Sequence, residues 1–344
     1  MRTKQLVWLL VAVFCGLGGS VSAQLLPNLG GQRAGVSALS FLKSDVNPRS
    51  MGMSGASVAL PVDGYAVFNN PAAISLQRQF NVSTSNLAFG AGLHQSFLST
   101  IIPRKDAPSG FAVSLNTLNS GPMEVRTEFQ PGGTGQQFYA TNLAAGLSYS
   151  QSLSDKFSLG LTLKYIYEQL DQYTNHTGAF DFGFLYTTDV RDLRFAVLVQ
   201  NFGGNSALDG DFLEIDFNRD NTVEVNNYTV PTTFKLGLSF VPWKRDQQSL
   251  LASAQLDHPN DNSENLRFGL EYEYLKLLFL RMGYKINVQG QNFPSFGVGY
   301  RARVGAHPLR VNYSINPTQY LGIQHSFGLS FTLNRSNRDR DEAE

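Results

Sequence analysis

The feature that most constrains this chain is an alternation of apolar and polar residues that returns along most of its length. Between residues 157 and 168, Phe, Leu and Tyr fill the odd positions, while Ser, Gly, Thr, Lys, Ile and Glu fill the even ones. A period of two places alternate side chains on opposite faces of a β-strand. Similar runs occur at 180–187, 234–240, 266–274, 296–301, 309–315 and 327–333. The chain is therefore predicted to be all-β.

Two properties of these runs favour a transmembrane barrel over a soluble β-sandwich. Many runs approach the roughly 9 to 11 residues of a tilted membrane strand, whereas soluble strands average about 5 to 6. Their apolar face carries large aromatic residues, often with Tyr near one end, as at Tyr165, Tyr167, Tyr272 and Tyr274. Aromatic residues gather at the two membrane interfaces of such barrels, and polar residues face the lumen.

The pattern predicts an antiparallel barrel of about 14 strands, an even number as expected for bacterial single-chain barrels. The expected strands are 80–89, 93–103, 110–129, 139–151, 156–169, 177–187, 192–202, 231–242, 249–257, 265–275, 277–287, 293–304, 308–316 and 324–333. With the N-terminus in the periplasm, short turns fall at 152–155, 188–191 and 275–276. The longer connections, 130–138, 170–176, 203–230 and 258–264, fall on the outside.

The ends of the chain do not alternate. Arg2 and Lys4 precede a short apolar run from Leu6 to Phe14, and the small residues of Val21-Ser22-Ala23 follow. This order is typical of a secretory signal peptide, so residues 1–23 are expected to be cleaved. A membrane-anchor helix needs about 20 apolar residues, and bulky Phe14 before Cys15 disfavours a lipoprotein anchor. The prediction places residues 24–78 in the lumen or its periplasmic mouth as a plug, the barrel at 79–333 and a charged flexible tail at 334–344.

Composition supports export and excludes some functions. Cys15 is the only cysteine, so the mature chain has no disulfide. Basic and acidic residues are equal in number, 27 each, and nothing in this balance points to nucleic acid. The expected location is the bacterial outer membrane, with outer-membrane lipid around the barrel.

The N-terminal segment carries a family resemblance. Ser40-Phe41-Leu42 leads to the stretch from Asn47 to Ala56, and Asp63 to Ala72 follows. These stretches, with 138–150, 156–167 and 180–186, resemble the PorV/PorQ family of Bacteroidota outer-membrane proteins. That family is a branch of the long-chain fatty-acid transporter superfamily. It combines an aromatic-Leu pair, an Arg-x-x-x-Gly-Gly-type stretch and an Asn-Pro-Ala box.

The resemblance covers most of the mature chain and implies a 14-stranded barrel with an N-terminal plug that works with the type IX secretion system. The plug motif residues carried over are Arg49, Gly52, Gly55, Asn70, Pro71 and Ala72. Asn70 can also cap a helix that begins with Pro71. The stretch from Met51 to Gly55 lacks the family's second glycine, so the resemblance does not choose between a PorV-like role, a PorQ-like role and another task.

Charged residues recur on the lumen face of the predicted strands. The basic ones are Lys164, Lys235, Arg267, Arg281, Lys285, Arg301, Arg303 and Arg310, and the acidic ones are Glu168, Asp181, Glu271 and Glu273. They could attract an anionic group. Charged residues are also ordinary in a solvated lumen, where they pair with one another and with the plug, and this second interpretation is favoured.

Signals for metal, cofactor or catalytic chemistry are weak. Residues 216–221 faintly resemble a calcium loop, but Asn221 and Asn227 stand where the invariant Gly and the bidentate Glu should be. The five histidines do not form a pair at metal-ligand spacing, and no nucleophile-elbow motif occurs. We expect no enzyme activity, metal or cofactor.

Two functions remain open. The resemblance implies a component of the type IX secretion system that binds other secretion-system proteins or secreted cargo at the cell surface. Superfamily analogy implies instead a channel for small hydrophobic molecules. The second hypothesis predicts an apolar pocket between the plug and the barrel wall.

Overall fold

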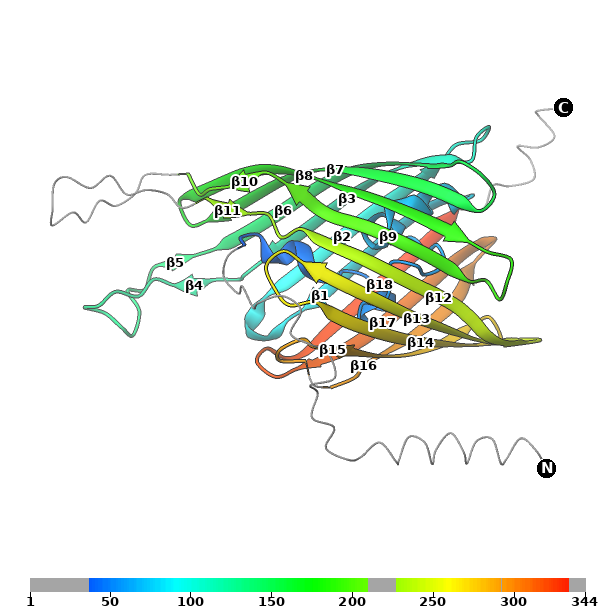
Figure 1. Ribbon diagram of the computed structural model, residues 1–344. Coiled ribbons are helices and arrows are strands. Elements are labelled where there is room, and N and C mark those ends of the chain that lie inside the picture. The colour runs from blue at the N-terminus through cyan, green and yellow to red at the C-terminus, as the bar shows by residue number, and fades with distance from the viewer. Residues whose placement is uncertain (1–36, 210–226, 292, 334–344) are drawn as a thin grey trace, which may run out of the picture.

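The computed structural model describes residues 37–209, 227–291 and 293–333. Fourteen strands form a closed antiparallel barrel, which confirms the predicted fold class (Figure 1). The barrel strands, in order around the wall, are β1 (Phe80–Ala88), β2 (His94–Pro103), β3 (Ser109–Asn119), β6 (Ala140–Ser152), β7 (Phe157–Leu170), β8 (Tyr173–Thr187), β9 (Arg194–Gly203), β12 (Thr233–Arg245), β13 (Gln248–Pro259), β14 (Asn265–Tyr274), β15 (Leu278–Ile286), β16 (Ser295–Val304), β17 (His307–Thr318) and β18 (Gly322–Leu333). Pairing of β18 with β1 closes the barrel.

The remaining elements are short. They are η1 (Ser40–Lys43), α2 (Pro48–Met51), α3 (Ala66–Asn69), η2 (Pro71–Leu76), η3 (Gly90–Gly92), and the two-stranded ribbons β4 (Met123–Glu124) with β5 (Gln137–Phe138) and β10 (Asn205–Ser206) with β11 (Tyr228–Thr229). The predicted signal peptide, the calcium-like stretch 216–221 and the predicted tail 334–344 lie outside the described residues.

Two expectations about the strands are wrong. The predicted strand 110–129 ends at Asn119, because Gly121 adopts a φ of 71° and Pro122 has no N–H to donate. The next residues leave the barrel and form the β4–β5 ribbon. The predicted loop 170–176 is a tight turn of Asp171 and Gln172, since Asp171 adopts a φ of 55° and β7 and β8 pair up to it.

The two ends of the barrel differ. Strands are joined by short turns at 104–108, 153–156, 188–193, 246–247, 275–277 and 305–306, and this end is called the short-turn mouth. The opposite end, called the long-loop mouth, carries the connections 120–139 and 204–232. The β4–β5 ribbon projects from it, whereas β10–β11 lies beside β8 at the wall (Figure 1).

The alternation separates an apolar outer face from a polar inner face. Val113, Leu163 and Phe268 are 52%, 58% and 44% exposed, although they are large and apolar. Similar residues on the other strands make an apolar outer band, which is the surface that a barrel presents to lipid. The inner face carries buried Ser, Thr, Asn and Gln. No helix within 37–209, 227–291 or 293–333 has the length and hydropathy to cross a membrane.

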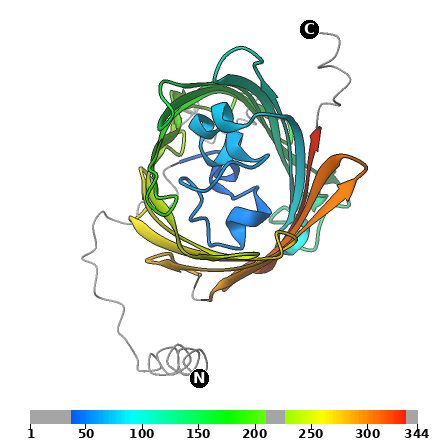
Figure 2. The same cartoon turned by 90° about the vertical axis from the view of Figure 1, so that its right-hand side faces the viewer.

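The segment before β1 lies inside the barrel (Figure 2). Its described part, residues 37–79, is called the plug below. Ser37 bridges to Thr229 and bonds to Asp261 at the long-loop mouth, whereas β1 begins at Phe80 at the short-turn mouth. The described plug therefore spans the lumen from one mouth to the other.

Candidate functional site

Hydrogen bonds from the wall hold the plug backbone. The plug contains only short helical pieces, so many of its N–H and C=O groups need partners outside regular structure. Polar side chains of the wall supply them. Examples are Ser85 Oγ to Val46 O at 2.5 Å, Gln95 Nε2 to Phe41 O at 3.1 Å, Ser99 Oγ to Gly64 O at 2.9 Å, Ser239 Oγ to Ala59 O at 2.6 Å, Ser253 Oγ to Ala56 O at 2.8 Å, and the Ser57 and Val58 amides to Gln255 Oε1, both at 2.9 Å. The plug is thus fitted to the wall by specific bonds.

The Asn-Pro-Ala box packs tightly against the wall. Asn70 caps η2, because its Oδ1 accepts a bond from the Ala72 amide at 3.0 Å, and its Nδ2 donates to Val58 O and Phe184 O. Pro71 and Ala72 lie on a part of the wall where the inner face is glycine. A Cβ on Gly160 would lie 2.3 Å from the Ala72 nitrogen, and one on Gly183 would lie 2.3 Å from Asn70 Oδ1.

A buried ionic network fixes the middle of the plug. Arg49, on α2, makes a two-pronged contact with Glu271 of β14, at 2.8 Å from Nε and 2.7 Å from Nη2. It also contacts Asp63 at 3.2 Å. Arg281 of β15 donates to the same Glu271 at 2.6 Å and to Asn312 at 2.9 Å. Burial alone would lower the pKa of Arg49, but the adjacent carboxylates of Glu271 and Asp63 raise it above its usual value, so Arg49 stays charged.

The two glycines of the predicted plug motif, Gly52 and Gly55, lie in close contact with the wall. Gly52 faces Gly297 of β16, and a Cβ on Gly52 would lie 2.9 Å from the Gly297 Cα. Gly55 has a φ of 80°, and a Cβ there would lie 2.3 Å from Arg267 Nη1. Gly55 therefore leaves room for the Arg267 guanidinium, which pairs with Asp257 at 2.7 Å.

The other predicted lumen charges fall into three groups. Lys164 pairs with Asp181 at 2.7 Å, and the Asp181 carboxylate also accepts the Asn201 amide at 2.7 Å beside a bulge in the β8–β9 pair. Glu168 accepts a bond from Asn175 at 3.3 Å. Arg301 and Arg310 lie opposite each other on β16 and β17, and Arg303 is exposed at the end of β16. Lys164 and Asp181 are thus paired locally, whereas Arg301, Arg303 and Arg310 form no ion pair with a described residue.

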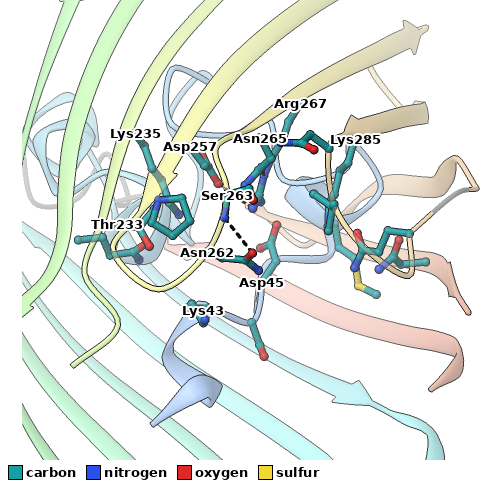
Figure 3. A pocket seen from close by; sticks show the side chains of 18 of the residues that line it. Lys43, Asp45, Thr233, Lys235, Asp257, Asn262, Ser263, Asn265, Arg267 and Lys285 are labelled. Atoms are coloured by element: carbon teal, nitrogen blue, oxygen red, sulfur yellow. Dashed lines mark hydrogen bonds and ion pairs between the residues drawn. The ribbon is translucent and has the colours of Figure 1, made fainter. Parts of the chain in front are cut away.

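A polar pocket of about 320 Å³ lies between the plug and the wall at the long-loop mouth (Figure 3). Four neighbouring strands each contribute one charged residue: Lys235 of β12, Asp257 of β13, Arg267 of β14 and Lys285 of β15. The plug contributes Lys43, which pairs with Asp261 at 2.5 Å, and Asp45. Burial raises the pKa of Asp45, although bonds from Ser50 and the Asn47 amide partly offset that rise.

Two lysines of this pocket form no ion pair, although the carboxylates of Asp45 and Asp257 act on both of them electrostatically. Asp257 forms an ion pair with Arg267 and accepts a hydrogen bond from Gln255, and Asp261 forms an ion pair with Lys43. Within the described ranges, Lys235 and Lys285 make no ion pair or side-chain hydrogen bond, while both line the pocket. The arrangement can therefore receive an anionic group at the plug–wall boundary. Sequence reasoning placed both lysines in the lumen but could not distinguish them from the paired charges.

The apolar pocket expected beside the plug is small. A cavity of about 20 Å³ lies among Leu42, Val67, Phe68 and Phe97. The larger apolar hollow, lined by side chains such as Phe240 and Phe268, is on the lipid-facing side of β12–β15. The described residues contain no cluster of His, Cys, Asp and Glu that could hold a metal ion.

Solved structures with the same barrel include transporters and channels. The toluene transporter TodX of Pseudomonas putida aligns with 87% of this chain and 100% of its own, at 13% identity and a TM-score of 0.58. The toluene transporter TbuX of Ralstonia pickettii aligns with 83% of this chain and 97% of its own, at 13% identity and a TM-score of 0.52. The monoaromatic hydrocarbon channel CymD aligns with 84% of this chain and 97% of its own, at 12% identity and a TM-score of 0.52. No family model matches the sequence, and neither does any curated protein.

At such low identity, these likenesses establish the fold. A closed barrel of fourteen antiparallel strands, with an apolar outer band and the fold of these transporters, is a protein of the bacterial outer membrane.

The close approach at Gly160 yields a stability prediction. Gly160→Ala should destabilise the folded barrel by about 1–3 kcal/mol, because the added methyl meets plug backbone that cannot rotate away. The measurement is the temperature at which the compact barrel band is lost in denaturing gels. Gly178→Ala is the matched control, since its Cβ would make an ordinary contact of 3.8 Å. Equal effects of the two variants would contradict the tight fit.

The ionic network yields a second prediction. Arg49→Met should cost about 3 kcal/mol, because it leaves buried carboxylate charge with fewer partners. It should also loosen the plug and raise ion conductance across planar bilayers. Arg303→Met is the control, because the exposed Arg303 should shift stability by no more than about 0.5 kcal/mol. Unchanged melting and conductance in Arg49→Met would show that the network does not hold the plug.

Proposed function

We propose that this protein takes up small hydrophobic molecules that carry a polar or anionic end, and that they enter through the pocket at the long-loop mouth. The observation that carries this proposal is the pocket itself. It lies at the plug–wall boundary and presents the amino groups of Lys235 and Lys285, which make no ion pair with a described residue. Ligand sites generally combine apolar lining with a few placed polar groups, and here Met51, Leu87 and Val288 supply apolar surface.

The polar character of this pocket narrows the substrate class. The fold neighbours named as toluene transporters and as a monoaromatic hydrocarbon channel support passage of small apolar molecules. The cavity among Leu42, Val67, Phe68 and Phe97, beside the described plug residues, holds about 20 Å³, which is too small for such a molecule. A short-chain amphiphile, with its charge on the lysines, fits the larger pocket better than a bare hydrocarbon does.

Binding of octanoate tests the proposal, with octanol as the matched uncharged probe. Purified full-length protein in detergent should bind octanoate more tightly than octanol by isothermal titration calorimetry. A charge-assisted hydrogen bond contributes about 1.5–3 kcal/mol, so Lys235→Gln with Lys285→Gln should weaken octanoate binding by roughly tenfold or more. Lys276 is an exposed turn residue outside the pocket and serves as the control. Lys276→Gln should bind octanoate as the wild type does. Equal binding of both probes, or no loss in the double variant, would refute the proposal.

A second candidate function is work with the type IX secretion system, as the PorV/PorQ resemblance implies. One observation favours it. The 120–139 connection projects from the long-loop mouth and carries Phe129, which is 94% exposed. Exposed aromatic residues are common anchors of protein interfaces.

Removal of the β4–β5 ribbon separates the two candidates. Replacing residues 123–138 with a short Gly-Ser linker should abolish any stable partner that co-purifies from solubilised membranes, and should block display of secreted cargo. Octanoate binding should persist, because the pocket lies elsewhere. The Lys235→Gln, Lys285→Gln variant should show the reverse pattern. Normal cargo display in both variants and in a full deletion strain would remove the secretion role.

A further inference from the structure

A second pocket lies on the other side of the plug, at the short-turn mouth. It has a volume of about 230 Å³, and its lining includes Arg49, Phe279, Arg281, Arg301 and Arg310. Helix α2 stands between the two pockets, because Met51 lines the pocket at the long-loop mouth and Arg49 lines this one. The octanoate test concerns the first pocket, so a role for the second is independent of it.

Three guanidinium groups surround one buried ring in this pocket. The Cζ atoms of Arg301, Arg281 and Arg310 lie 5.1, 5.5 and 5.8 Å from the centroid of the Phe279 ring. Phe279 is only 6% exposed. Cation–π contacts of this kind favour the cations, but they do not neutralise them or satisfy their N–H groups.

Arg281 differs from the other two arginines. It is bonded to Glu271 and Asn312, so its charge and donors are used within the plug network. The side chains of Arg301 and Arg310, by contrast, form no ion pair and no hydrogen bond with any residue that the structure describes. They are direct cross-strand partners on β16 and β17. Like charges directly opposite each other destabilise a sheet unless something compensates them.

Among the described residues, no remaining carboxylate forms an ion pair with either arginine of this pair. Glu271 is shared between Arg49 and Arg281, and Asp192 lies 3.9 Å from Lys244 at the rim. Glu273 also lines the pocket, but it accepts a bond from Ser249 and is beyond ion-pair distance of both Arg301 and Arg310. Two guanidinium groups therefore face one unshared carboxylate across a cavity.

We propose that the pocket at the short-turn mouth binds a small oxyanion, a phosphate or carboxylate group, between Arg301 and Arg310. Each guanidinium offers a planar fork of N–H donors that matches two oxygens on one centre. An oxyanion seated between the forks receives bonds from both and removes the repulsion between them. The opening beside Asp192 and Lys244 leads to this site from the short-turn side, so the ligand enters from the compartment that this mouth faces.

Inorganic phosphate is the probe that tests this site. Phosphate should raise the melting temperature of the full-length protein in detergent, saturably and beyond the effect of chloride at equal ionic strength. Arg301→Gln with Arg310→Gln should weaken this response at least tenfold. Without phosphate, this double variant should be at least as stable as the wild type, since the substitutions remove the repulsion between the two guanidinium groups. Arg303→Gln, two residues further along β16 and exposed, should respond as the wild type does.

The test does not depend on the double variant being stable. Broadening of the phosphorus resonance of phosphate by wild-type protein, reversed by excess sulfate, reports binding directly, and Arg310→Gln alone should reduce it. No stabilisation by phosphate beyond that of chloride would overturn the proposal. So would an equal response in the wild type and in the Arg301, Arg310 variant. Succinate in place of phosphate shows whether the site prefers carboxylate or phosphate oxygens.

Discussion

The structure depends on satisfying the backbone of a segment that crosses a barrel lumen without forming long helices or strands. Such a segment carries donors and acceptors that cost free energy when buried alone. Serine and glutamine side chains on the inner wall accept or donate those bonds, as Ser99 does for Gly64 and Gln255 does for Ser57. The small residues of the wall also leave space for the plug backbone. The polar face of the alternation is therefore a binding surface for the chain's own N-terminal segment.

The barrel could be predicted because its signal is local. Alternation over one strand indicates which residues face lipid, as the runs through Leu163 and Phe268 show. The count of fourteen predicted strands agrees with the closed barrel. The errors fell where local rules compete. Gly121 and Pro122 ended an alternating run that continued in sequence to 129, and Asp171 made a tight turn where polar residues indicated a loop.

The site was predicted only in part because its partners are distant in sequence. Arg49 was singled out from a resemblance, but nothing local could reveal that Glu271, 222 residues away, would bind it. Alternation likewise placed Lys235, Arg267, Arg301 and Arg310 in the lumen without showing which would be paired. That depends on register between strands: Arg267 reaches Asp257, while Arg301 meets Arg310. The glycines opposite the Asn-Pro-Ala box were a usable signal, since glycine on the inner face marks a close backbone approach.

The plug also limits how any solute could pass. Between the long-loop pocket and the short-turn pocket lies the plug around α2, where Arg49 is bound to Glu271 and Asp63. Separating these groups without replacement leaves buried charges unpaired, at a cost of several kcal/mol. An anionic end group lowers this cost. It can form an ion pair with the Arg49 guanidinium while Glu271 stays paired with Arg281. Under the proposed uptake function, the basic residues without ion pairs on both sides of α2 favour an anionic or amphiphilic ligand over a bare hydrocarbon.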